Sequence, residues 1–464
     1  MEKKKFRMPT AYTILFLLLI LVAASTWVIP AGSYDRTGEE ETPVAGTYQT
    51  VEQNPQGAGD VILASFQGFY DAVDVALFIL MVGGFLGVVM KTGAIDAGVS
   101  NVIRILNGKE ILLIPVLMIL FSLGGTSFGM WEETMAFYPL LIPVFLSAGY
   151  DPLVGISVVL LGSGAGVLAS TVNPFATGIA SGFAGVSLGD GLVVRLIMLI
   201  LFDGIAIWYV MAYARKVRNH PEKSLVAGFS RRVAARKGGD VPMLTTRRKL
   251  VLTLFAIVFL IMIYGVIPFD EIGLPLPTLG WWFPELSGLF FIGGLVIGLA
   301  YGLGEVDTVD AFVAGAADLV GVGFIIGISR GITVLMDNGR ITDTVLYWGE
   351  QALEGTGSVA FILLVYLIYL PLSVLIPSSS GLATLSVPIL APLGQFAEIG
   401  GDLIVTAFQS ASGLVNIVTP TAAVVMGGLA LGDVPYDRWV RFVWKLILIF
   451  FLLTLGFLAV SAIL

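Results

Sequence analysis

The feature that most constrains this chain is a series of apolar runs, several of which are long enough to cross a lipid bilayer. Such runs cover residues 11–29, 192–214 and 443–464. Crossing the bilayer core takes about 20 residues of helix. Only 12% of the residues are charged and 57% are hydrophobic, whereas a soluble protein carries about twice that share of charges. The sequence therefore predicts an all-α polytopic protein of the inner cell membrane.

Reactive side chains are scarce, and this excludes several classes of function. The chain has no cysteine and a single histidine, His220, in a polar segment. We therefore expect no thiolate metal site, no disulfide and no enzyme, because no nucleophile lies beside a base. The net charge of −8 argues against a nucleic-acid partner. We expect no cofactor other than Na⁺ or H⁺ as a coupling ion, and the expected partners are a small-molecule substrate and the bilayer.

The distribution of basic residues predicts the orientation in the membrane. Four of the first seven residues are basic, and residues 215–249 carry eleven lysines and arginines against two acids. Basic segments stay on the cytoplasmic side. The acidic segment 35–60 then lies outside. We expect a cytoplasmic N-terminus, a cytoplasmic basic linker and a C-terminus on the outer side.

Two pairs of apolar segments are too short to span the membrane. Residues 111–123 and 134–146 are joined by 124–129 (GGTSFG), and residues 360–375 and 385–396 are joined by 376–381 (IPSSSG). Short apolar helices joined by a polar turn are typical of re-entrant hairpins, whose irregular backbone lines a polar cavity. The charge topology opens the first hairpin to the cytoplasm and the second to the outside.

The two halves of the chain resemble each other. Alignment places Val88, Met90, Gly93 and Ile95 on identical residues at 334, 336, 339 and 341, with the hairpins and helix breaks in the same order. Opposite membrane orientation makes these halves inverted repeats, which are typical of secondary transporters. We expect an N-terminal helix and outer loop at 1–60, a first repeat at 61–214, a cytoplasmic basic linker at 215–249, connecting helices at 250–304 and a second repeat at 305–464.

Two long apolar runs are broken by polar residues and a proline, at 170–174 (STVNP) and 416–420 (NIVTP). Proline frees a backbone carbonyl one turn earlier, and such carbonyls with nearby hydroxyls and amides can bind Na⁺ or a substrate. The alternative is that the small residues only permit close helix packing. The predicted substrate-binding residues are Thr126, Ser127, Glu133, Ser170, Asn173, Ser378, Ser379, Ser380, Asn416 and Thr419, with possible Na⁺ binding at Thr126, Asn173, Ser379 and Thr419.

Ionisable residues inside apolar segments are costly and therefore indicate function. Glu132 and Glu133 follow the first hairpin turn, and Glu133 has no acidic counterpart in the second hairpin. Asp203, Asp318 and Arg330 lie within predicted spans. We interpret these three as possible coupling or structural groups, with Arg330 a candidate partner for a substrate carboxylate.

Several separated motifs resemble the YfcC family over nearly the whole chain. They lie at 6–13 (FRMPTAYT), 27–32 (WVIPAG), 329–333 (SRGIT), 337–344 (DNGRITDT) and 376–383 (IPSSSGLA). That family is grouped with DcuC-type C4-dicarboxylate carriers and ArcD-type arginine/ornithine exchangers in the ion transporter superfamily. The resemblance implies inverted repeats with re-entrant hairpins, a scaffold that forms a homodimer and a transport domain that moves as an elevator.

The hairpin turns depart from the superfamily pattern for dicarboxylates. Those members carry Ser-Asn-Thr at both turns for Na⁺ and carboxylate, whereas this chain has Gly-Thr-Ser and Ser-Ser-Ser. The hydroxyls are kept and the amide is missing. We therefore favour exchange of a basic amino acid, with a Na⁺- or H⁺-coupled C4-dicarboxylate carrier and a channel as the alternatives.

Overall fold

The computed structural model describes residues 11–37, 42–98, 101, 109–187, 189–227, 243–266, 269, 275–281, 283–353 and 355–463. It confirms a mostly helical, polytopic membrane protein. Seven helices in the described ranges are long and apolar enough to cross a membrane. They are Val73–Lys91, Glu110–Ser127, Leu192–Asn219, Phe283–Tyr301, Glu305–Asn338, Ser358–Leu375 and Tyr436–Ser461.

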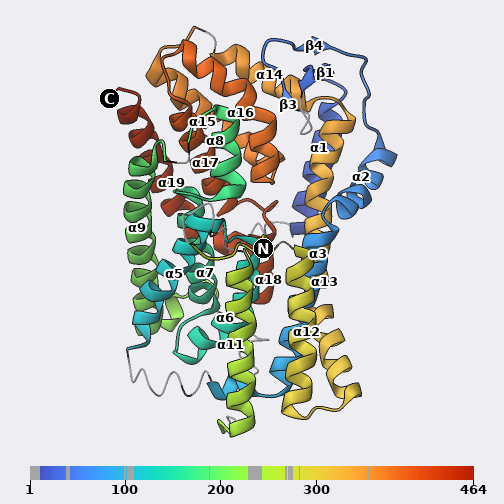
Figure 1. The fold of residues 1–464 in the computed structure, drawn as a ribbon, viewed down its shortest axis with the longest axis vertical. Helices are drawn as coiled ribbons and strands as arrows, with labels where there is room; N and C mark the ends of the chain where they lie inside the picture. The colour runs from blue at the N-terminus through green and yellow to red at the C-terminus, as the bar shows by residue number, and fades with distance from the viewer. Residues whose placement is uncertain are drawn as a thin grey trace, which may run out of the picture.

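One group of helices packs mainly against itself and is called the wall below. Its central helices are in backbone contact, because a Cβ on Gly83 would lie 2.6 Å from the carbonyl oxygen of Gly315. Small residues of this kind let membrane helices approach closely. The wall comprises α1 (Ala11–Ser25), α2 (Ala58–Asp71), α3 (Val73–Lys91), α11 (Thr246–Val266), α12 (Phe283–Tyr301) and α13 (Glu305–Asn338); α3, α12 and α13 stand on the right of Figure 1.

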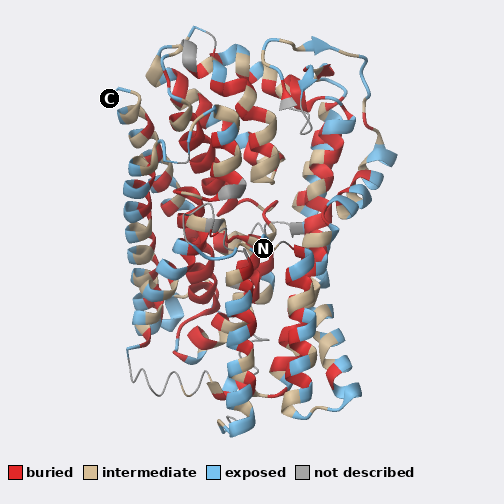
Figure 2. Ribbon diagram, in the orientation of Figure 1, coloured by how far each residue is buried: buried red, intermediate tan, exposed pale blue. Residues whose placement is uncertain are grey.

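A second group of helices is called the core bundle. Its centre is α7 (Pro152–Leu168), which is buried along its whole length, and α17 (Gly401–Asn416), which is buried from Leu403 onward. Both helices pack against each other, and Figure 2 shows buried residues concentrated at the centre of the molecule. The other members are α5 (Leu113–Phe128), α6 (Tyr138–Ser147), α8 (Ile179–Ala184), α9 (Leu192–Asn219), α15 (Ser358–Leu375), α16 (Ser379–Phe396), α18 (Ala423–Leu431) and α19 (Tyr436–Ser461).

The two predicted hairpins enter the core bundle from opposite ends. The expectation that both of their helices are too short to span is wrong for the first helix of each pair, because Glu110–Ser127 and Ser358–Leu375 are long and apolar enough to cross a membrane. The pair α15 and α16 lies in the upper part of Figure 1, whereas α5 and α6 lie lower. The predicted position of the first turn is wrong, because α5 continues through residues 124–128 and ends at Gly129, whose φ is +75°. A 3-10 helix, η2 (Glu132–Phe137), then leads into α6. The early glycines do not end the helix: a Cβ on Gly125 would lie 2.5 Å from the Ser163 carbonyl oxygen of α7.

The segment after α1 is tied to α14 (Thr342–Leu353) at one end of the molecule. It forms two short antiparallel ladders, β1 (Gly32–Ser33) with β4 (Gln49–Thr50), and β2 (Arg36–Thr37) with β3 (Thr42–Pro43). Arg36 forms an ion pair of 3.0 Å with Asp343 of α14, and the Tyr34 hydroxyl donates to Glu350 at 2.6 Å. Burial beside Glu350 raises the pKa of Tyr34, so this hydroxyl stays a donor.

The described ends of the basic linker lie at the opposite end of the molecule. Arg218, in the last turn of α9, pairs with Glu110 at 3.0 Å. At the start of α11, Nε of Arg248 donates to the carbonyl of Thr92, just after α3, at 3.1 Å. Short 3-10 turns, η1 (Glu110–Leu112) and η4 (Pro221–Lys223), complete this end. In Figure 1 the strands lie at the top and the start of α11 at the bottom.

Candidate functional site

A cavity of about 260 Å³ lies between the wall and the core bundle. The segments at which helices are interrupted line this cavity. They are the first hairpin turn after α5, the second hairpin turn and both breaks. The wall contributes the junction between α2 and α3, together with residues of α12 and α13. In the part of the chain that the structure describes, this cavity is where the predicted polar breaks converge.

The first break follows α7 and is held by α5. The Thr126 hydroxyl donates to the Ala169 carbonyl at 3.0 Å and accepts from the Thr171 amide at 3.0 Å. The chain resumes at Pro174 as a π-helical turn, η3 (Pro174–Gly178). Asn173 lines the cavity, and its Oδ1 accepts from the Ala176 amide at 3.3 Å. Gly129 of the first hairpin also lines the cavity, and a Cβ there would lie 2.6 Å from Asn173 Oδ1.

The second break separates α17 from α18. Two side chains from α19 bond its carbonyls: the Tyr436 hydroxyl donates to Val418 at 2.7 Å, and Trp439 Nε1 donates to Ile417 at 3.0 Å. These bonds satisfy backbone groups that would otherwise be costly to bury. Asn416 lines the cavity, and its side-chain amide has no hydrogen-bond partner among the described residues. That amide is therefore available to a ligand.

The second hairpin turn presents three serines to the cavity. The Ser378 hydroxyl accepts from the Gly381 amide at 3.2 Å and lies 3.2 Å from the Ser380 hydroxyl. Ser379, at the first position of α16, lines the cavity with them. The start of a helix carries partial positive charge, so this turn favours an anionic group such as a carboxylate.

The charges around the cavity are mostly negative. Four carboxyl groups line it, from Asp71, Asp74, Glu132 and Glu133, together with one guanidinium, from Arg330. Glu133 is 7% exposed, and its Oε2 accepts from the Trp131 amide at 3.1 Å. Within the described ranges Arg330 forms no ion pair, although it interacts electrostatically with Glu132. The cavity can thus hold a cationic group and a carboxylate together.

Several predicted site residues line this cavity. They are Glu133, Asn173, Ser378, Ser379, Ser380 and Asn416, with Arg330 opposite them on the wall.

Other predicted residues lie outside the lining. Thr126 binds the first break, Ser127 donates to the Leu123 carbonyl at 2.5 Å, and Ser170 accepts from the Thr177 hydroxyl at 2.6 Å. Thr419 bonds the Thr421 hydroxyl at 2.8 Å. The buried hydroxyls of Thr126, Ser170 and Thr419 bond within or beside the breaks, whereas Ser127 bonds only within α5.

The remaining predicted groups are more distant from the site. Asp203 lies on α9, and Asp318 is exposed on α13. Of the four residues predicted for Na⁺, only Asn173 and Ser379 line the cavity. Among the described residues, no group of three or more His, Cys, Asp or Glu side chains could hold a metal ion.

The sequence reasoning missed Asp71 and Asp74. They flank Ala72, at which α2 ends and α3 begins. A signal existed in the sequence, because two acids three residues apart directly precede an apolar span.

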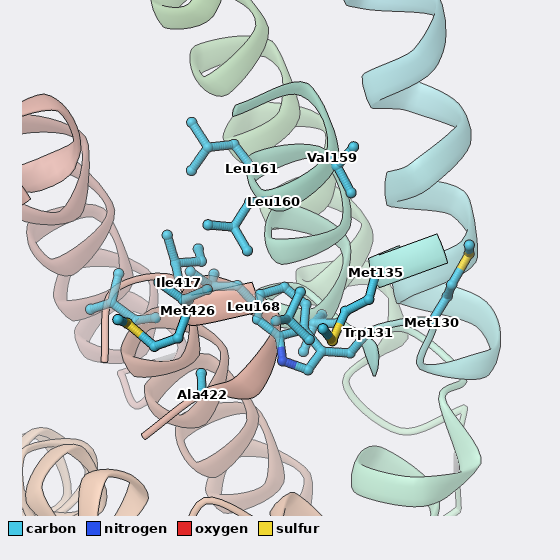
Figure 3. Close-up of a cluster of buried hydrophobic side chains, with 14 of the residues drawn as sticks. Met130, Trp131, Met135, Val159, Leu160, Leu161, Leu168, Ile417, Ala422 and Met426 are labelled. Carbon is cyan, nitrogen blue, oxygen red and sulfur yellow. The ribbon is translucent and has the colours of Figure 1, made fainter. Parts of the chain in front are cut away.

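An apolar cluster adjoins the cavity and connects the first hairpin to the second break. Figure 3 shows Trp131 and Met135 of the hairpin near Leu168 of α7, with Ile417 and Met426 on the other side of Leu168. Trp131 also lines the cavity. The close fit of α7 is visible at Gly164, where a Cβ would lie 2.7 Å from Ile417 Cγ1.

Comparisons with known proteins support a membrane carrier. The family described as C4-dicarboxylate anaerobic carrier, DcuC, matches residues 8–463. An uncharacterized protein of Haemophilus influenzae is 36% identical over 96% of this chain and 95% of its own length. A protein of Escherichia coli K12 named "Putative basic amino acid antiporter YfcC" is 30% identical over 94% of this chain and 93% of its own length.

Two solved structures match nearly the whole chain, but with low sequence identity and low TM-scores. MtrF of Neisseria gonorrhoeae, reported with a class of antimetabolite efflux pumps, matches 98% of this chain and 95% of its own at 16% identity, with a TM-score of 0.43. The YdaH transporter of Alcanivorax borkumensis matches 98% of both chains at 16% identity, with a TM-score of 0.42. Scores of this size do not establish a shared fold.

Proposed function

The chain belongs to the family of DcuC-type C4-dicarboxylate anaerobic carriers, and we propose that it exchanges basic amino acids across the membrane by alternating access. Membership and the YfcC relative confirm the resemblance seen in the sequence. The chain is a secondary membrane transporter and not an enzyme. A carrier binds its substrate in a closed site, in contrast to the channel considered above.

The balance of charge in the cavity is the observation that carries the substrate proposal. Four carboxyl groups face one guanidinium, so a cationic substrate is attracted and a dianion is opposed. The α-carboxylate of an amino acid would bind the serines of the second hairpin and Arg330, and its basic side chain would extend toward Glu133. The YfcC relative carries the name of a basic amino acid antiporter, which agrees with this choice.

A finer architecture completes the proposal. We propose that the halves are inverted repeats, that the wall is the scaffold of a homodimer, and that the core bundle is the transport domain of an elevator. The exposed apolar side chains of the wall support a lipid or subunit contact, among them Phe66 at 64% and Tyr70 at 76%. The basic linker supports a cytoplasmic N-terminus and an outer C-terminus in the inner membrane.

A C4-dicarboxylate is the second candidate, because the family bears that description. Arg330 and the three serines would bind its carboxylates, with Na⁺ or H⁺ offsetting the negative charge of the cavity. Protonation of Glu132 and Glu133 would be needed to relieve the repulsion.

Counterflow in proteoliposomes tests the substrate class. Vesicles loaded with unlabelled arginine, ornithine or succinate are placed in labelled substrate, with and without a Na⁺ gradient. We expect exchange of arginine and ornithine. The Glu133→Gln variant should raise KM for arginine at least tenfold, because an ionic contact to the substrate becomes a neutral one. Glu222→Gln, an exposed acid in the linker, is the matched control. Exchange of succinate alone would refute the proposal.

A further inference from the structure

The polar and charged groups around the cavity are carried by two different bodies. Arg330 and Asp74 belong to the wall, whereas Glu133, Ser379 and Asn416 belong to the core bundle. We propose that Arg330 and Asp74 form a half-site fixed to the wall, which contacts the substrate on one side of the transport cycle only. This inference rests on the proposed function. It adds that the binding site has different ligands when it faces one side of the membrane than when it faces the other.

Arg330 is held rigidly within the wall. A Cβ on Gly68 of α2 would lie 2.5 Å from the Gly327 carbonyl oxygen and 2.8 Å from the carbonyl carbon of Arg330. On the next residue, a Cβ on Gly331 would lie 2.8 Å from the Ala64 carbonyl oxygen. The backbones of α2 and α13 therefore touch on both sides of Arg330. No layer of side chains separates them there, so Arg330 cannot travel with the core bundle without breaking this contact.

Asp74 is fixed in the same body. It lies in the first turn of α3, and its Oδ1 accepts from the Val75 amide at 2.8 Å. The contact between Gly83 and Gly315 joins α3 to α13. The guanidinium and the carboxylate of the half-site therefore keep their relative positions.

The ligand groups on the other side are joined to one another inside the core bundle. The Thr126 hydroxyl bonds the first break to α5. A Cβ on Gly413 of α17 would lie 2.7 Å from the Leu168 amide nitrogen of α7, so the backbones of α17 and α7 touch. The second hairpin packs on α8 and α17 through α16. Asn173, Asn416 and the serines therefore move as one unit.

At the junction of α18 and α13, the two bodies meet through side chains. Where α18 meets α13, a Cβ on Gly427 would lie 3.1 Å from the Val322 side chain, which is a contact of side chain rather than backbone. A long hydrogen bond of 3.4 Å runs from the Thr333 hydroxyl to the Leu375 carbonyl. A boundary of this kind permits sliding, and sliding separates the wall charges from a substrate held by the core bundle.

Cysteine labelling tests the partition without any knowledge of the substrate. The chain contains no cysteine, so an introduced cysteine is the only thiol. Val75→Cys reports on the wall and Ala423→Cys on the core bundle, since both positions line the cavity. A membrane-impermeant maleimide is applied to sealed right-side-out and inside-out vesicles. We expect Val75→Cys to react from one face and Ala423→Cys from both faces.

Two labelling results would overturn the inference. One is reaction of Val75→Cys from both faces at similar rates. The other is reaction of Ala423→Cys from one face alone, because the core bundle would then not move past the wall.

Kinetics in the two vesicle orientations test the half-site itself. We expect Arg330→Gln and Asp74→Asn to raise KM for arginine at least tenfold on one face and less than twofold on the other. Glu133→Gln should raise KM equally on both, and Arg215→Gln, an exposed cation at the end of α9, should leave both unchanged. Equal effects of Arg330→Gln on both faces would refute the half-site. A wild-type protein that moves no basic amino acid would instead refute the proposed function, and the labelling result would still stand.

Discussion

Replacement of Thr126 by valine should weaken the fold while leaving the affinity for substrate unchanged. Valine keeps the shape of threonine and removes the hydroxyl, which donates to the Ala169 carbonyl. The Thr171 amide and hydroxyl keep a partner, because both also donate to the Thr126 carbonyl at 3.1 Å. One buried carbonyl therefore loses its donor, at a cost of about 1–3 kcal/mol. Side-chain hydrogen bonds between membrane helices average about 0.6 kcal/mol, so we expect a loss of about 1–2 kcal/mol.

Thermal unfolding of the purified protein in detergent measures this loss, and KM for arginine is measured in parallel. Thr253→Val is the matched control, because the Thr253 hydroxyl is exposed and bonds only within its own helix, to the Lys249 carbonyl at 3.0 Å. We expect a lower Tm for Thr126→Val, an unchanged Tm for the control and an unchanged KM for both. A normal Tm with a strongly raised KM would contradict this reasoning and return Thr126 to the list of substrate ligands.

Three further substitutions test other parts of the structure. Gly83→Leu should reduce the yield of monodisperse protein on size-exclusion chromatography severely, because the backbones of α3 and α13 touch there; a normal yield would show that the contact is dispensable. Asp343→Asn should accelerate proteolysis of residues 32–50, since the ion pair to Arg36 is lost, and an unchanged cleavage rate would count against that role. Tyr436→Phe should lower both Tm and exchange rate by leaving the Val418 carbonyl without its donor; full activity at wild-type Tm would argue that the second break needs no support from α19.

The breaks and the membrane class were predictable from local sequence. Pro174 and Pro420 mark interruptions because proline cannot continue the hydrogen bonds of a helix. The structure ends α7 at Leu168 and α17 at Asn416, close to both prolines. The serines at the start of α16 were found for a similar reason, since a polar turn between two apolar helices has few other places in a membrane.

The first hairpin turn was misplaced because glycine has two uses in membrane helices. Gly125 serves close packing against Ser163 rather than a turn, and the helix ends at Gly129, where a positive φ is required. Local sequence cannot separate these uses, because the packing partner lies on another helix. Asp71 and Asp74 were missed on similar grounds, since their place in the site depends on how the wall docks against the core bundle.

The left-handed turn at Gly129 limits how this transporter can be retuned. A side chain there would be strained, and it would also press on the amide of Asn173. Position 129 therefore tolerates only glycine, and this side of the cavity cannot be reshaped by substitution there. A larger substrate would need smaller side chains on the wall side of the cavity, at Phe283 or Ile326. Redesign of selectivity should begin with those two residues.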